Sequence, residues 1–120
     1  MCIRDSNRPN KRNSLSANLR GELFEVLENN DQDENINATI IRGSGRAFSA
    51  GYDLTKDPDE KDPYYSAGGL GYWPRHVVDG CFKIWDLAKP VIAQVHGYCL
   101  AGGTELALSL IHISEPTRPY

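Results

Sequence analysis

The chain has 120 residues, with 13 Lys or Arg against 16 Asp or Glu, so its formal net charge at pH 7 is −3. This mild acidity argues against a general nucleic-acid-binding surface. No apolar run reaches the roughly 20 residues that a membrane-spanning helix needs, so we expect neither a nucleic acid nor a membrane as a partner.

The first half of the chain predicts a helix followed by a strand. Apolar residues at helical spacing between Leu19 and Leu27, after a Ser N-cap at position 14 or 16, predict a helix over about residues 16–29. The β-branched run that ends at Gly43 predicts a buried strand near residues 38–42.

The second half repeats this alternation. Residues 55–74 are rich in Asp, Pro, Gly and Tyr without periodicity, which predicts a long loop. Helical spacing then predicts a helix over about residues 76–88, ended by Lys89-Pro90, and a second buried strand near residues 91–96. Gly102-Gly103 opens a further helix. Alternating strands and helices indicate an α/β or mixed α+β architecture. The residues expected in the interior are Ile40, Ile41, Val91, Ile92, Ala93 and Val95.

Two turns built from small residues carry the chemistry. The first, RAFSAGYDL, occupies residues 46–54 and follows a predicted strand. The second, KPVIAQVHGYCLAGGTEL, occupies residues 89–106 and leads into a predicted helix. Small residues let the backbone approach a ligand closely. Two such turns can each donate one N–H group to a single oxygen, forming an oxyanion hole that stabilises charge developing on a carbonyl.

This pair of turns, in this order and with a Glu three residues after Gly102, resembles the signature of the enoyl-CoA hydratase/isomerase (crotonase) superfamily. The resemblance covers nearly all of residues 7–107 and implies an α/β, truncated crotonase-like fold of stacked ββα units. It implies that Ala50 and Gly102 donate the two oxyanion-hole N–H groups. It also implies that Glu105 is the first catalytic glutamate, which orients a water for attack on C3 of an enoyl thioester.

The resemblance also implies a substrate-binding surface. The residues expected to border the CoA thioester and pantetheine are Ala50, Gly51, Tyr52, Asp53 and Gly102. Asp53 is further expected to fix its loop through side-chain to backbone hydrogen bonds. Lys11 and its neighbour Arg12 are candidates for contact with the CoA phosphates, although an exposed Lys-Arg pair is also typical of solvated surface. No cofactor is expected, because CoA is part of the substrate.

Other residues have both functional and structural interpretations. Tyr64, Tyr65, Tyr72 and Trp73 either line an acyl pocket or serve in packing. His96 stands where the family often has Asn, and we expect it to be a hydrogen-bonded structural residue. Cys81 and Cys99 show no CxxC spacing and no Cys/His cluster, which predicts free, buried thiols, a reducing cytoplasmic location and no metal site.

The two ends of the chain differ from the rest. One back-translation of residues 1–6 is ATG TGT ATA AGA GAC AG, and its reverse complement encodes residues 108–112. The ends are therefore compatible with one DNA segment read from opposite strands, which resembles the adapter of transposon-based sequencing libraries. We expect residues 1–6 and 108–120 to be adapter-like tails, and residues 7–107 to be the N-terminal part of a crotonase-like domain.

The activity implied is that of a lyase that hydrates a 2-enoyl-CoA. The family's hydratases use a second glutamate about one helix and one strand further on, so we expect this chain by itself to be inactive. An isomerase, a dehydratase or a hydrolase with the same oxyanion hole, or a non-catalytic acyl-CoA-binding module, are the alternatives. A nucleotide-binding role for Gly102-Gly103 lacks a supporting motif. The parent protein is expected to be a homo-oligomer, a trimer or a hexamer.

Overall fold

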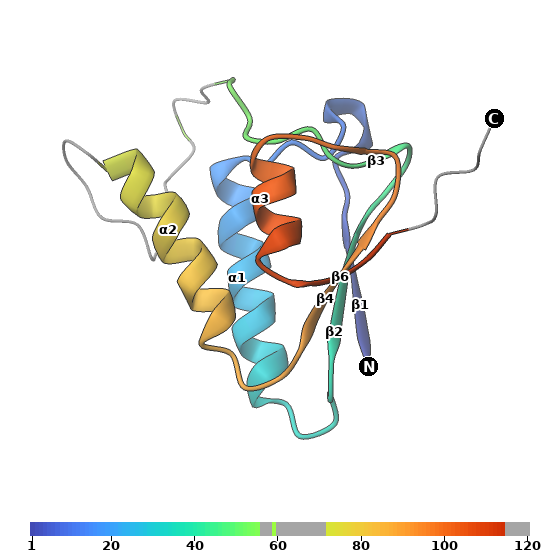
Figure 1. The fold of residues 1–120 in the computed structure, drawn as a ribbon, viewed down its shortest axis with the longest axis vertical. Helices are drawn as coiled ribbons and strands as arrows, with labels where there is room; N and C mark the ends of the chain where they lie inside the picture. The colour runs from blue at the N-terminus through green and yellow to red at the C-terminus, as the bar shows by residue number, and fades with distance from the viewer. Residues whose placement is uncertain (56–58, 60–71, 115–120) are drawn as a thin grey trace.

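The computed structural model describes residues 1–55, 59 and 72–114. Within them, three helices lie on one side of a four-stranded parallel sheet (Figure 1). The strands of this sheet are, in spatial order, β1 (Cys2–Ser6), β2 (Thr39–Gly43), β4 (Val91–Val95) and β6 (Ile111–Ser114). A second, two-stranded sheet joins β3 (Ala47–Ser49) and β5 (Tyr98–Cys99). The helices are α1 (Ala17–Gln32), α2 (Tyr72–Trp85) and α3 (Gly102–Leu108), and a short 3-10 turn, η1, spans Pro9–Lys11.

A repeated ββα unit organises the molecule. Strands β2 and β3 precede α2, and strands β4 and β5 precede α3. Equivalent strands pair in parallel, with Thr39 opposite Val91 in one sheet and Ala47 opposite Tyr98 in the other. This repetition stacks one unit on the next, which confirms the predicted fold of stacked ββα units. It also brings the turns that follow β3 and β5 to the same end of the molecule.

Helix α1 begins where the sequence predicts and runs three residues longer. The Ser16 side chain caps it by accepting a hydrogen bond from the Leu19 N–H at 3.2 Å, as expected for a serine N-cap. The predicted end near residue 29 is extended to Gln32, where the Asp33 N–H donates to the Asn29 carbonyl at 3.1 Å. The face of α1 that packs on the sheet is therefore more than four turns long.

Helix α2 is shifted toward the N-terminus relative to the prediction of residues 76–88. It ends at Trp85, before Pro90 imposes a stop. After the end of α2, Lys89 is bound to the C-terminal part of α1. The Lys89 N–H donates to Asp31 Oδ1 at 2.9 Å, and the Lys89 Nζ donates to the Asp33 carbonyl at 2.6 Å. Most of the predicted loop over residues 55–74 lies outside the described residues.

The core lies between the sheet and the helices. Ile41, Val91 and Ala93 are 3%, 7% and 0% exposed, as predicted. Ile40 and Ile92 are only half-buried, because alternate residues of a strand point to opposite faces and these two face away from the helices. Val95 is also half-buried, at the margin of the core. No helix in the described ranges is long and apolar enough to cross a membrane.

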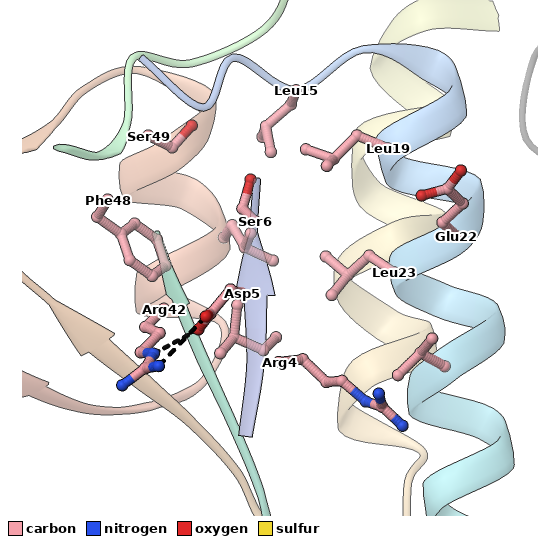
Figure 2. A pocket seen from close by; sticks show the side chains of 13 residues that line it. Arg4, Asp5, Ser6, Leu15, Leu19, Glu22, Leu23, Arg42, Phe48 and Ser49 are labelled. Carbon is pink, nitrogen blue, oxygen red and sulfur yellow. Dashed lines mark hydrogen bonds and ion pairs between the residues drawn. The ribbon is translucent and has the colours of Figure 1, made fainter. Parts of the chain in front are cut away.

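The terminal segments, which the sequence analysis set apart, both form edge strands. Strand β1 pairs with β2 and places Arg4 beside Ile41, and strand β6 pairs with β4. A cavity of about 130 Å³ lies beneath β1, walled by apolar side chains that include Leu15, Leu23 and Phe48 (Figure 2). The origin of these terminal residues stays a prediction, and their pairing is the part of the fold that the sequence pattern did not indicate.

Candidate functional site

The first turn, between Ala50 and Asp53, is fixed by the backbone of the segment that precedes α1. The Ala50 N–H donates to the Arg12 carbonyl at 2.9 Å, and the Leu15 N–H donates to the Gly51 carbonyl at 2.7 Å. The predicted role of Ala50 as an oxyanion-hole donor is therefore wrong in this structure, because its hydrogen is already committed to another carbonyl. This bond depends on a pairing between segments almost forty residues apart.

The Tyr52 amide of this turn points in a different direction from the Ala50 amide. Leu15 bonds to the residues on either side of Tyr52, accepting from the Asp53 N–H at 3.1 Å as well as donating to Gly51. In such a parallel bridge the N–H of the central residue points away from the partner segment. Gly51 has φ +99°, a left-handed conformation that glycine adopts without steric strain. The Tyr52 amide is thereby turned away from the α1 segment.

The second turn places Gly102 at the first position of α3. The Gly103 N–H donates to the Leu100 carbonyl at 2.8 Å, and the Thr104 and Glu105 N–H groups donate to the Ala101 carbonyl. For the Gly102 N–H the structure gives no acceptor among the described residues, as is usual for the first amide of a helix. This amide is therefore available to an external oxygen, and its predicted role as an oxyanion-hole donor stays a prediction.

The two turns meet around Tyr52, Gly102 and Glu105. The Tyr52 hydroxyl donates to Glu105 Oε2 at 3.2 Å. A Cβ atom placed on Gly102 would lie 2.4 to 2.8 Å from three ring carbons of Tyr52, so only glycine fits beneath this ring. Burial, followed by the negative charge of Glu105, raises the pKa of the Tyr52 hydroxyl above its ordinary value. Tyr52 therefore stays protonated and remains a donor to the carboxylate.

A cavity of about 40 Å³ lies at this junction. Its lining combines the predicted residues Tyr52, Gly102 and Glu105 with Arg20 from α1 and Cys81 from α2. Arg20 is 8% exposed, and its guanidinium lies 5.6 Å from the centre of the Tyr52 ring, within cation–π range. The small cavity thus holds a carboxylate, a phenol and a guanidinium next to an available backbone amide.

Sequence reasoning missed Arg20 and Cys81, although spacing carried a signal for the former. The buried side chains of α1 are Arg20, Phe24, Leu27 and Asn30, which follow helical spacing. Arg20 therefore belongs to the inward face, whereas a charged helical residue is usually taken for surface. Cys81 and Cys99 are free, as predicted, but the prediction that they are buried is wrong, because both are only half-buried.

Asp53 anchors the first turn. Its Oδ1 accepts from the Thr55 N–H at 2.9 Å, which confirms the predicted bond to its own loop, and its Oδ2 forms an ion pair with Arg8 at 2.8 Å. The Thr55 bond first, and then the Arg8 side chain, lowers the pKa of Asp53 to about 2. Asp53 therefore links η1, through Arg8, to the turn that carries Tyr52.

The remaining candidates lie away from the small cavity. Lys11 borders a separate, polar cavity of about 450 Å³ together with Arg8 and Asp53, and its contact with CoA phosphates stays a prediction. His96 donates from Nε2 to the Gly45 carbonyl at 2.9 Å, which confirms the structural role expected for it.

The aromatic candidates for an acyl pocket lie wholly or partly outside the described residues. Tyr64 and Tyr65 lie outside the described residues. Tyr72 and Trp73 form the first turn of α2, and their side chains lie outside the described part as well.

Comparison with known proteins gives a consistent result. A sequence model of the family described as enoyl-CoA hydratase/isomerase matches residues 5–110. The chain is 39% identical over 100 residues to a carnitinyl-CoA dehydratase of Citrobacter koseri, covering 82% of this chain and 36% of the relative. It is 38% identical over 100 residues to an enoyl-CoA hydratase of Mycobacterium tuberculosis, covering 83% and 37%.

Solved structures agree with the sequence relatives. An enoyl-CoA hydratase/isomerase from Xanthobacter autotrophicus Py2 matches with a TM-score of 0.76 at 35% identity, over 93% of this chain and 41% of that one. An enoyl-CoA hydratase from Bacillus anthracis matches with a TM-score of 0.74 at 30% identity, over 93% and 42%. The chain spans little more than a third of the length of the curated relatives it matches. It belongs to the enoyl-CoA hydratase/isomerase family.

Proposed function

We propose that this chain carries the first part of an acyl-CoA site, and that the complete protein is a lyase that adds water to a 2-enoyl-CoA thioester. The observation that carries the proposal is the meeting of the Gly102 amide with Glu105 at one cavity. The names of the relatives favour this reaction class, because a hydratase adds water and a dehydratase removes it. CoA enters as part of the substrate, and we propose no separate cofactor.

The proposed mechanism begins with the thioester oxygen at the Gly102 N–H. Addition of water to C3 moves negative charge onto this oxygen, and backbone donors aimed at it stabilise the transition state. Because the Ala50 amide is bonded to Arg12, we propose the Tyr52 amide as the second donor. Loss of one such donor typically costs about 3–4 kcal/mol of transition-state stabilisation.

Glu105 is proposed to hold the attacking water. Its carboxylate lies three residues beyond Gly102, one turn along α3, and accepts a hydrogen bond from the Tyr52 hydroxyl. A carboxylate in this position can accept a proton from a bound water that attacks the substrate. The second acid/base group of the family's hydratases is expected beyond these 120 residues, so we propose that the chain alone does not turn over.

A non-catalytic acyl-CoA-binding module is the second candidate. It would use the Gly102 amide in the same way, but it has no need of a carboxylate beside that amide. An isomerase or another branch of the family is a further alternative. Such an enzyme would either use Glu105 or rely on the acid/base group that this chain lacks.

We also propose that the parent is a homo-oligomer, in keeping with the family resemblance.

The test is to incubate the complete protein with 2-butenoyl-CoA and to identify the product by NMR. We expect 3-hydroxybutanoyl-CoA, with the hydroxyl oxygen taken from solvent. A product in which the double bond has only moved would assign the protein to the isomerase branch. Binding without any product would favour the binding module, and the absence of both binding and product would overturn the proposal of an acyl-CoA site.

A further inference from the structure

The side chain of Tyr52 packs against the backbone of Gly102, on the side where a Cβ atom would stand. Ring carbons Cδ2, Cε2 and Cζ lie 2.4 to 2.8 Å from the position that a Cβ of Gly102 would take. Non-bonded carbon atoms normally approach to about 3.5–4.0 Å, so the ring rests directly on the backbone of Gly102. An acyl group whose carbonyl oxygen reaches this amide must share its surroundings with the phenol ring.

Little room remains beside the ring. The cavity lined by Tyr52, Gly102 and Glu105 measures about 40 Å³, and one buried water needs about 10–15 Å³ of such volume. The cavity therefore holds a few water molecules, and an extended hydrocarbon chain does not fit. Apolar side chains of α1 and α2 close its inner wall, among them Phe24 and Ile84, which are 5% and 6% exposed.

The ring is held from two sides. Its hydroxyl donates to Glu105 Oε2 at 3.2 Å, and the guanidinium of Arg20 lies 5.6 Å from its centre. Arg20 is itself fixed, because it is buried and its Nε donates to the Ser16 carbonyl at 3.3 Å. Tyr52 is not a member of the buried apolar core of this molecule. The hydroxyl contact with Glu105 and the guanidinium of Arg20 therefore fix its position together with the packing of the ring on Gly102.

We propose that Tyr52 is a specificity-determining residue: its ring, held in place by Glu105 and Arg20, restricts the Gly102 amide to short acyl groups. The inference rests on the proposed function, because it places the thioester oxygen at Gly102. It adds to that function a substrate class, short-chain acyl thioesters, and assigns the selection to a single side chain. Removal of the ring should open the site to longer chains.

The first experiment measures selectivity by binding. Dissociation constants of butanoyl-CoA and decanoyl-CoA, which lack the double bond and so cannot be hydrated, are determined by calorimetry for the complete protein and for its Tyr52→Ala and Tyr52→Phe variants. The wild type is expected to prefer the short thioester, and Tyr52→Ala to reduce this preference at least tenfold, since excluding or admitting even one methylene is worth about 10–200-fold. Tyr52→Phe keeps the ring but loses its tether, so its preference should be intermediate.

The outcomes separate this inference from the proposed function. Equal selectivity in the wild type and Tyr52→Ala, with both binding, overturns the inference and leaves the acyl-CoA site intact. Failure of both thioesters to bind any variant overturns the acyl-CoA site and the inference with it. Far-UV circular dichroism of each variant establishes that the fold is retained, and Tyr52→Phe covers the case in which Tyr52→Ala does not fold.

A second experiment tests the tether without any ligand. The chain contains six tyrosines, and the NMR signal of a 13C-labelled Tyr52 is identified by its loss in Tyr52→Phe. The pKa of Tyr52 is expected to lie above the ordinary value and to fall in Glu105→Gln, because the neighbouring negative charge is removed. Glu25→Gln, at an exposed position of α1, is the matched control and should leave the titration unchanged. Identical titrations in Glu105→Gln and the wild type would overturn the role of Glu105 in holding the ring.

Discussion

The site and the edge of the sheet under β1 are packed in opposite ways. At the site, a cavity of about 40 Å³ holds Tyr52 and Glu105, whose polar atoms bond to each other. Under β1, a cavity of about 130 Å³ is lined largely by apolar side chains (Figure 2), and the buried hydroxyl of Ser6 has no hydrogen-bond partner. The larger cavity is therefore a mainly apolar, incompletely packed space, and the smaller one is lined by polar groups that interact with one another.

The strand register explains this difference. In β2 and β4 most residues that face the helices are apolar, such as Ile41 and Ala93, and the buried Thr39 is bonded to Asn30 of α1. The residues of β1 on the same face are Cys2, Arg4, beside Ile41, and Ser6, while Ile3 points the other way and is 50% exposed. Because neighbouring strand residues alternate between faces, β1 presents its polar set to the core. This placement of polar side chains on the core face leaves the space beneath β1 incompletely filled.

The largest expected effect comes from widening the cavity under β1. Phe48 is 2% exposed, belongs to the core and lines this cavity. Phe48→Ala should lower the free energy of unfolding by about 3–5 kcal/mol, since it removes a buried ring beside space that is already empty. Urea denaturation measures the change. A loss below about 1 kcal/mol would show that the surrounding helices collapse into the space and that the cavity is not rigid.

Filling the same cavity should have the opposite sign. Ser6→Leu removes the unpartnered hydroxyl, whose burial costs about 1–3 kcal/mol, and places an apolar side chain against Leu15 and Leu23. We expect the free energy of unfolding to rise by about 2 kcal/mol, measured by urea denaturation. The affinity for 2-butenoyl-CoA should stay unchanged, and a change in that affinity would contradict the assignment of this cavity to packing alone.

A smaller effect is expected from the ion pair that anchors the first turn. The pKa of Asp53 is lowered to about 2 from the ordinary 3.8, so its ionised form stabilises the fold. This contribution is fully present above the ordinary pKa and is lost as the pH falls from 3.8 toward 2. In Asp53→Asn, unfolding experiments at different pH values should show about 1–2 kcal/mol less dependence on pH in this window. An unchanged pH dependence would remove Asp53 from the acid sensitivity of the fold.

The same contrast explains how far the sequence could predict the structure. Helix α1 was predictable because its apolar residues follow helical spacing, and strands β2 and β4 because each is a short, largely apolar run rich in β-branched residues. The proximity of Gly102 and Glu105 was also predictable, since they stand one turn apart on one helix. Strand β1 was not, because its polar and apolar residues occupy the wrong faces for a core strand.

The details of the site depended on long-range pairing. The direction of the Ala50 amide is set by its bond to the Arg12 carbonyl, and no local pattern in the sequence reveals that register. The ion pair of Arg8 with Asp53 joins residues forty-five positions apart, so it could not be predicted from spacing. The family resemblance placed Glu105 and Gly102, but only the fold showed that the ring of Tyr52 packs against Gly102 and that its hydroxyl bonds to Glu105.

The most direct test of the account is the turnover of 2-butenoyl-CoA by the complete protein and by its Glu105→Gln variant. Hydration is followed by loss of the enoyl thioester absorbance, and Glu25→Gln is the matched control on α1. We predict that Glu105→Gln lowers kcat by about 10²–10⁴-fold, as expected for a positioned acid/base group, while the control keeps wild-type activity. Equal turnover by the wild type and Glu105→Gln would contradict the assignment of this cavity as the active site.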